Sequence, residues 1–162
     1  MTTSRTPPQK TAADHGESTV RRRYNACAAF FDRFVGHAVL ALVMRSAIAA
    51  VFLLSGRTKV EGLITVTDAA VSLFRDEYKF PLVSPQLAAH LAAYAEHVLP
   101  VLLVLGLFTR GAALALLGMT AVIQVLVYPD AWPTHLTWAG PLLYLVARGG
   151  GNLAVDRWLG LK

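Results

Sequence analysis

The sequence has few charged residues and almost no cysteine. Only 15% of its 162 residues are charged, whereas 55% are hydrophobic. A soluble domain of this size needs more polar surface than that, so the composition argues against an ordinary soluble fold. A single cysteine, Cys27, excludes an internal disulfide, and neither a CxxC nor a CxxCH motif occurs. A cleavable signal is not evident either, because the run Arg21-Arg22-Arg23 is not followed directly by an apolar region.

What the sequence does contain is a series of apolar blocks, each close to the roughly 17 to 25 residues that cross a bilayer. The last block is the shortest and only just reaches this length. The last three blocks are separated by short connections, which predicts that they are antiparallel neighbours. We therefore expect an all-α, polytopic membrane protein, an antiparallel four-helix transmembrane bundle. The predicted spans are at about residues 38–56, 87–107, 111–128 and 131–147.

The polar segments predict the rest of the domain organisation. Residues 1–23 are polar and predict a disordered cytoplasmic tail. Residues 24–37 carry apolar side chains at helical spacing, which predicts an interfacial helix before the membrane domain of residues 38–162. In the long loop between the first two spans, apolar residues from Val66 to Tyr78 share one helical face. That pattern predicts an amphipathic helix on the outer membrane surface.

The distribution of basic residues predicts the orientation. Ten lysines and arginines lie on the side of the two termini, and four lie in the long loop, where four acidic residues offset them. The positive-inside rule then places both termini in the cytoplasm and the protein in the inner (plasma) membrane. In such a protein the net charge of +5 marks cytoplasmic segments and indicates no nucleic-acid partner.

The second span contains Glu96 and His97 near its centre, followed by Pro100. An ionisable group inside a span usually faces the bundle and has a partner. We expect that partner to be Arg45 of the first span, since the two backbones differ in depth by roughly 6 Å. The pair is either structural, or Glu96 is a catalytic candidate that binds a proton or polarises a quinone carbonyl. Pro100 either frees the carbonyl of residue 96 for a ligand or only bends the span.

Two polar levels are expected inside the bundle. Arg45, Glu96 and His97 form the middle one, in which His97 should hydrogen-bond a neighbouring span. His90, Gln124 and His135 form the outer one. No metal is expected, because His90 and His97 are about 10 Å apart along the helix, too far to share one ion. A haem held by histidines of two spans is conceivable, but the sequence does not favour it.

Several segments together resemble the DoxX family of small four-span membrane proteins, over about residues 43–159. Arg45, Lys59, Glu96, Arg110 and Asp156 match positions that recur in that family, while "RGGG" replaces the commoner Arg-Gly-Pro-Gly form. The segments that carry the resemblance are "RSAIAAVFLLSGRTKV" (45–60), "LFRDEYKFPLVSP" (73–85), "AEHVLPVLLVLGLFTR" (95–110), "VYPDAWPTHLTWA" (127–139) and "RGGGNLAVDRWLG" (148–160).

The resemblance implies a function class and no particular reaction. Family members are linked to quinone-coupled oxidation of sulfur compounds, to membrane complexes that handle oxidative stress, and to gene clusters for modified metal-binding peptides. The expectation is a redox-associated, quinone-linked membrane subunit that is not an enzyme on its own and works beside a redox-enzyme partner in the lipid bilayer. No bound cofactor is evident in the sequence. The alternative is a non-catalytic adaptor or transporter for a small solute or a peptide pathway. The sequence does not determine the oligomeric state.

Overall fold

The computed structural model describes residues 12–161, which divide into two units after Gly36. The first unit contains one helix, α1 (Ala12–Phe34), rich in helix-forming alanine and arginine. The predicted disordered tail is therefore wrong for residues 12–23, where alanines and the Arg21–Arg23 run extend the helix expected only from residue 24. Residues 1–11 of that tail lie outside the described part of the chain.

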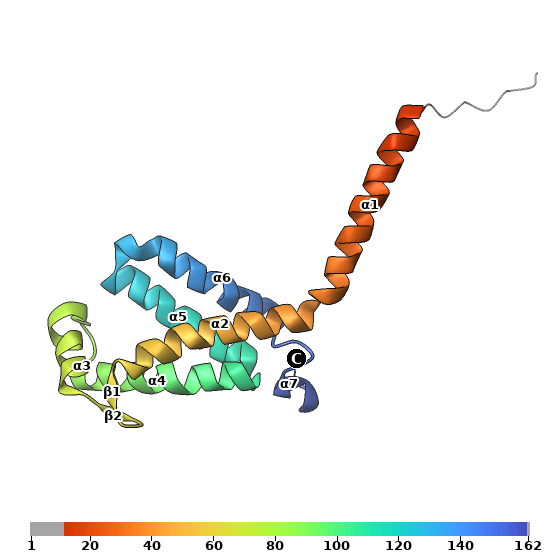
Figure 1. The fold of residues 1–162 in the computed structure, drawn as a ribbon. Coiled ribbons are helices and arrows are strands. Elements are labelled where there is room, and N and C mark those ends of the chain that lie inside the picture. Colours follow the sequence, from red (N-terminus) through yellow and green to blue (C-terminus); the bar gives the residue numbers. More distant parts are fainter. Residues whose placement is uncertain (1–11, 162) are drawn as a thin grey trace, which may run out of the picture. The chain divides into compact units, whose positions relative to one another are not determined.

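The second unit begins at His37 and contains every site discussed below (Figure 1). Its long helices correspond closely to the predicted spans, and a short hairpin and two helical segments occupy the first loop. The elements are α2 (His37–Arg57), β1 (Val60–Glu61), β2 (Thr65–Val66), α3 (Asp68–Leu73), the π-helix η1 (Phe74–Tyr78), α4 (Pro85–Leu105), α5 (Thr109–Val122), the π-helix η2 (Ile123–Val127), the 3-10 helix η3 (Pro129–Ala131), α6 (Trp132–Arg148) and α7 (Val155–Trp158).

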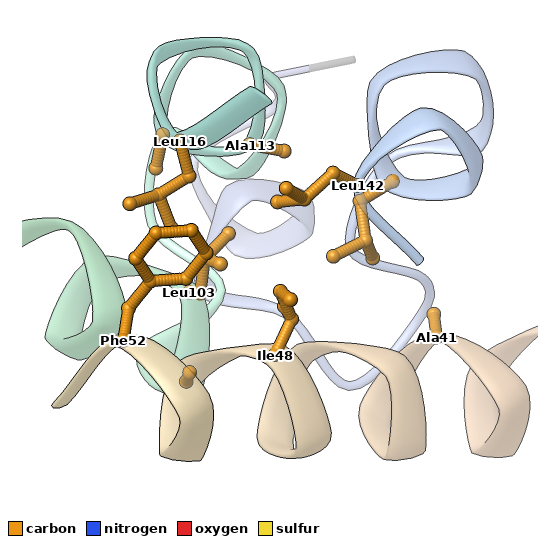
Figure 2. Close-up of a cluster of buried hydrophobic side chains, with 10 residues drawn as sticks. Ala41, Ile48, Phe52, Leu103, Ala113, Leu116 and Leu142 are labelled. Carbon is orange, nitrogen blue, oxygen red and sulfur yellow. The ribbon is translucent and has the colours of Figure 1, made fainter. Parts of the chain in front are cut away.

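Four helices pack around one apolar core. Figure 2 shows Ala41, Ile48 and Phe52 projecting from the same side of α2 toward Leu116 of α5 and Leu142 of α6. These three positions of α2 are spaced by seven and four residues, so they share one helical face. The core thereby fixes which side of α2 faces the other helices.

Much of the remaining surface of these helices is apolar. Exposed residues include Leu54, Val98, Val101, Leu114 and Val125. An apolar surface of this extent is unsuited to water and indicates contact with lipid. Three helices among the described residues are long and apolar enough to cross a membrane: His37–Arg57, Pro85–Leu105 and Thr109–Val127.

The first loop folds back onto the bundle. Strands β1 and β2 form an antiparallel pair in which Val60 faces Val66. Thr67 then caps α3 by accepting a hydrogen bond from the N–H of Ala70. The buried ring of Phe74 packs against Ala88 and Ala89 of α4. The loop therefore forms one wall of the interior near the start of α4, and a membrane-surface position for its helix stays a prediction.

Candidate functional site: a buried ion pair in an apolar cavity

The carboxylate of Glu96 pairs with Lys59 inside the bundle. The Lys59 ammonium donates a hydrogen bond to Glu96 Oε2 at 2.8 Å, and both side chains are buried. Lys59 also donates to the hydroxyl of Ser55 at 3.0 Å and to its carbonyl at 3.3 Å. The three hydrogens of the ammonium therefore all have acceptors, as a buried charge requires.

The predicted pair of Arg45 with Glu96 is wrong. The Arg45 guanidinium donates instead to the carbonyl of Val104 at 3.0 Å and to that of Gly150 at 2.9 Å. Val104 lies eight residues beyond Glu96, about 12 Å further along α4. The predicted pair requires the Arg45 side chain to extend toward the middle of the bundle, whereas it extends toward the C-terminal end of α4.

Arg45 belongs to a cluster that attaches the C-terminal segment to the bundle. This Arg45 cluster consists of Arg45, Gly106, Thr109, Gly150 and Asp156. The backbone N–H of Asp156 donates to the carbonyl of Gly106 at 2.9 Å, and its carboxylate accepts from the N–H groups of Phe108 and Thr109 at 2.6 and 2.8 Å. A carboxylate at the first turn of α5 satisfies amides that have no partner within the helix.

Two glycines allow the Arg45 cluster to pack this closely. A Cβ on Gly106 would lie 2.5 Å from an Arg45 guanidinium nitrogen, and one on Gly150 would lie 2.6 Å from both Ala154 Cβ and Thr109 Oγ1. Arg110, on the surface beside the cluster, donates to the carbonyl of Val146 at 3.1 Å and so links the start of α5 to α6. Arg110 and Asp156 thus each join the start of α5 to a later part of the chain.

The Lys59–Glu96 pair lines a cavity of about 720 Å³, within the range of cofactor and ligand pockets. Its walls come from α2, the first loop, α4, the end of α5 with η2, and the start of α6. They are mainly apolar, with a few polar groups. The polar and aromatic residues in the lining are Phe52, Ser55, Lys59, Phe74, Tyr78, Phe80, Glu96, Tyr128, His135 and Trp138. We call this space the Glu96 cavity.

His135, which lines the cavity, contacts Gln124, and these two residues of the predicted outer level therefore lie together. The Gln124 amide nitrogen donates to the carbonyl of Pro129 at 2.6 Å, which leaves its oxygen facing His135 Nδ1 at 2.6 Å. Nδ1 therefore carries a hydrogen in this contact. The buried His135 ring also lies against Trp138, with ring centroids 5.0 Å apart.

The other two histidines do not behave as predicted. His97 Nδ1 lies 2.6 Å from the carbonyl of Ala93 in its own helix, so it does not bond a neighbouring span. Its ring lies against Gly56, where a Cβ would come within 2.9 Å. His90 is exposed and contacts the carbonyl of Gln86 at 2.7 Å, so the outer polar level lacks it. Each ring contacts the backbone carbonyl four residues earlier in α4, so its Nδ1 is not directed at a neighbouring helix.

Two tyrosines connect the cavity to the first loop. The rings of Tyr78 and Tyr128 meet edge to face with centroids 5.8 Å apart. The Tyr128 hydroxyl donates to the Glu77 carboxylate at the surface. Burial raises the pKa of Tyr78 above its ordinary value of 10.0, so its hydroxyl stays protonated.

Sequence reasoning missed Lys59 as the partner of Glu96 because it placed Lys59 in the loop. A signal was nevertheless present. Ile48, Phe52 and Lys59 follow each other by four and seven residues, so Lys59 continues the buried face of α2 beyond its last turn. Pro100, which is buried, lies in an α4 that stays helical from Pro85 to Leu105.

Long apolar helices and an extensive apolar surface define the class: an α-helical integral membrane protein. The DoxX family model matches residues 40–129, more than half of the chain. The chain therefore belongs to the DoxX family. It is also similar to a Haemophilus influenzae protein described as uncharacterized, with 27% identity over 132 residues that cover 75% of this chain and 84% of that protein. No solved structure matches the chain.

Proposed function

We propose that this DoxX-family protein binds a quinone in the Glu96 cavity and serves as a redox-associated membrane subunit or accessory protein. The observation that carries the proposal is a buried ion pair in the wall of a mainly apolar cavity. Such a cavity suits an apolar molecule with a small polar head group. An ionisable pair inside a membrane bundle is a functional-site hypothesis by default.

The hydrogen bonds indicate which side chains have capacity for a ligand. Lys59 has used its three hydrogens, whereas Glu96 Oε1 has no hydrogen-bond partner in residues 12–161. Glu96 therefore holds or passes the proton, with Lys59 stabilising its charge. A quinone supplies two-electron, two-proton chemistry when bound, and in this proposal a partner redox enzyme exchanges the electrons with it.

The proposal includes the membrane arrangement. We place α6, with its 17 residues, as a fourth span beside the three longer ones, because it shares their core. The basic residues favour cytoplasmic termini in the inner membrane. Cysteines introduced at Thr67 and Asp130 should then react with an impermeant reagent on intact cells, while the exposed Cys27 should not. Labelling of Cys27 alone would reverse the orientation.

Quinone binding can be measured through Trp138, which lines the cavity. Titrating a ubiquinone or menaquinone analogue into purified protein should quench tryptophan fluorescence, and Trp138→Phe should lose most of that quenching. Glu96→Gln should weaken binding about tenfold, since a charged hydrogen-bonding group is lost. Its matched control is Glu61→Gln, an exposed glutamate on β1.

Binding of an alkyl compound of equal length without a quinone head group is measured in the same way, to distinguish the redox-associated role from the adaptor or transporter alternative. Binding of the quinone alone supports the redox-associated role. Equal binding of both, with no effect of Glu96→Gln, contradicts it and favours the adaptor or solute-transporter alternative.

A further inference from the structure

A second pocket lies at the opposite end of the bundle, beside the Arg45 cluster. Its volume is about 740 Å³, and none of its lining residues borders the Glu96 cavity. It is formed where α2 and α5 begin and α6 ends, together with the turn at 149–152 and the C-terminal residues near α7. Figure 1 shows α7 beside these helix ends.

The pocket is rich in positive charge. Arg110, Arg148 and Arg157 all line it. Within residues 12–161, Arg148 and Arg157 have no side-chain hydrogen bond or ion pair, and Arg110 uses a single N–H on the carbonyl of Val146. A guanidinium has five N–H donors, so most donors here are unused.

The carboxylate in the pocket does not neutralise these arginines. Asp156 accepts hydrogen bonds from the N–H groups of Phe108 and Thr109, and so is held at the first turn of α5. No arginine of the pocket forms a salt bridge with it in the described part of the chain. Three guanidinium groups against one carboxylate leave the pocket with a net positive charge.

Backbone donors add to the side chains. The N–H groups of Arg110 and Gly111 come next in the first turn of the 14-residue helix α5, and neither has an acceptor among the described residues. On the facing wall, the backbone turns at Gly149 and Gly151 with φ of 75° and 77°, values that glycine adopts without strain. Free first-turn amides beside arginines are the donor set that binds phosphate in many proteins.

We propose that this pocket binds a phosphate group, and that its source is the head group of an anionic phospholipid. The pocket lies at the ends of candidate membrane-spanning helices, which is the level of the lipid head groups. Exposed Phe108 and Leu161 lie in its lining, beside the arginines, where acyl chains would begin. The proposal does not depend on quinone binding or on the orientation of the protein.

Native mass spectrometry of the protein in neutral detergent tests the proposal. Short-chain phosphatidylglycerol, phosphatidylcholine and soluble glycerol phosphate are compared as ligands. The test variant is Arg148→Gln with Arg157→Gln. Its matched control is Arg75→Gln with Lys79→Gln, which removes two exposed charges from the first loop.

Phosphatidylglycerol should bind the wild type and the control equally, and the test variant about tenfold more weakly. Each single arginine variant should weaken binding by an intermediate factor, which keeps the test decisive if the double variant does not fold. Glycerol phosphate that binds as tightly as the lipid, and is lost in the test variant, supports the phosphate site but assigns a soluble source. Equal binding of phosphatidylcholine, or equal loss in the control, overturns the proposal.

Discussion

Two buried cations, Arg45 near the middle of α2 and Lys59 just beyond its end, are satisfied in opposite ways. Arg45 is surrounded by backbone: it donates to the carbonyls of Val104 and Gly150, and Asp156 nearby is occupied by backbone amides. Lys59 pairs with a side-chain carboxylate that borders a cavity. Backbone carbonyls have no proton to exchange, whereas a carboxylate can carry one. The contacts of Arg45 therefore join parts of the fold, and the Lys59–Glu96 pair supplies the group on which the proposed function rests.

The surroundings of the two cations also differ in how closely the side chains pack. The Arg45 guanidinium lines neither pocket: an added Cβ at Gly150 would fall 2.6 Å from Ala154 and Thr109, and the pocket of about 740 Å³ lies beside this contact. Around Glu96 the structure leaves about 720 Å³ of space. This space borders a buried charge pair and opens to the surface of the bundle, so a molecule can enter it from outside. A ligand is the occupant we favour.

The largest effect is expected where one charge of the Lys59–Glu96 pair is removed. Glu96→Met leaves the Lys59 ammonium buried without its carboxylate, which should cost about 3–5 kcal/mol of unfolding free energy. Lys59→Met should cost a similar amount. The double variant should be more stable than either single variant, because no charge is left unpaired. Unfolding in mixed detergent, followed by circular dichroism, measures the cycle, and strictly additive losses would show that the pair is not coupled.

A somewhat smaller loss is expected for Arg45→Met, about 3 kcal/mol, since two charge-assisted hydrogen bonds to carbonyls disappear. The loss should be the same in the wild type and in a Glu96→Met background, because the two residues do not contact each other. Arg45→Lys should recover only part of it, as an ammonium lacks the planar fork that reaches two carbonyls. A loss that shrinks sharply in the Glu96→Met background would restore the Arg45–Glu96 pair.

The sequence predicted the helices much better than their contacts. Apolar runs placed the first span at 38–56 and the fourth at 131–147, against observed helices His37–Arg57 and Trp132–Arg148. Which side chains come into contact depends on the rotation of each helix about its axis and on the conformation of the long side chains. The rise per residue gives the depth of a residue and carries no information on either. Gln124 and His135 were placed together correctly because short connections put them at the same level. Arg45 was not, because an arginine can extend in either direction along the bundle.

The site was harder to predict than the fold for a further reason. The cavity takes its walls from five separate segments, including the first loop, and no single stretch of sequence contains that information. The helix of residues 12–23 was missed because its polar composition was taken as disorder, although its alanines and arginines favour a helix.

A pair of glycine variants tests the difference in packing. Gly150→Ala should cost about 1–3 kcal/mol, since the new Cβ would overlap Ala154 and Thr109 and displace the Arg45 guanidinium. Gly118→Ala is the matched control, because nothing lies within 4 Å of a Cβ at that position of α5. It should be neutral or stabilise the helix by about 1 kcal/mol. If the two variants melt alike, the Arg45 cluster is looser than its geometry indicates.

The smallest effect is expected from the tyrosine at the loop wall of the cavity. Burial raises the pKa of Tyr78 above its usual value of 10.0, so the folded state favours the neutral phenol. The resulting stabilisation is present below pH 10 and is lost as the pH rises through the raised value. In an alkaline titration followed by tyrosinate absorbance, Tyr78→Phe should remove signal from the part of the curve above pH 10 and make the loss of stability above pH 10 shallower. Tyr144→Phe, on α6 away from the cavity, is the control. Signal lost from the earliest part of the curve would mean that Tyr78 is open to water, and that the loop does not close the Glu96 cavity on that side.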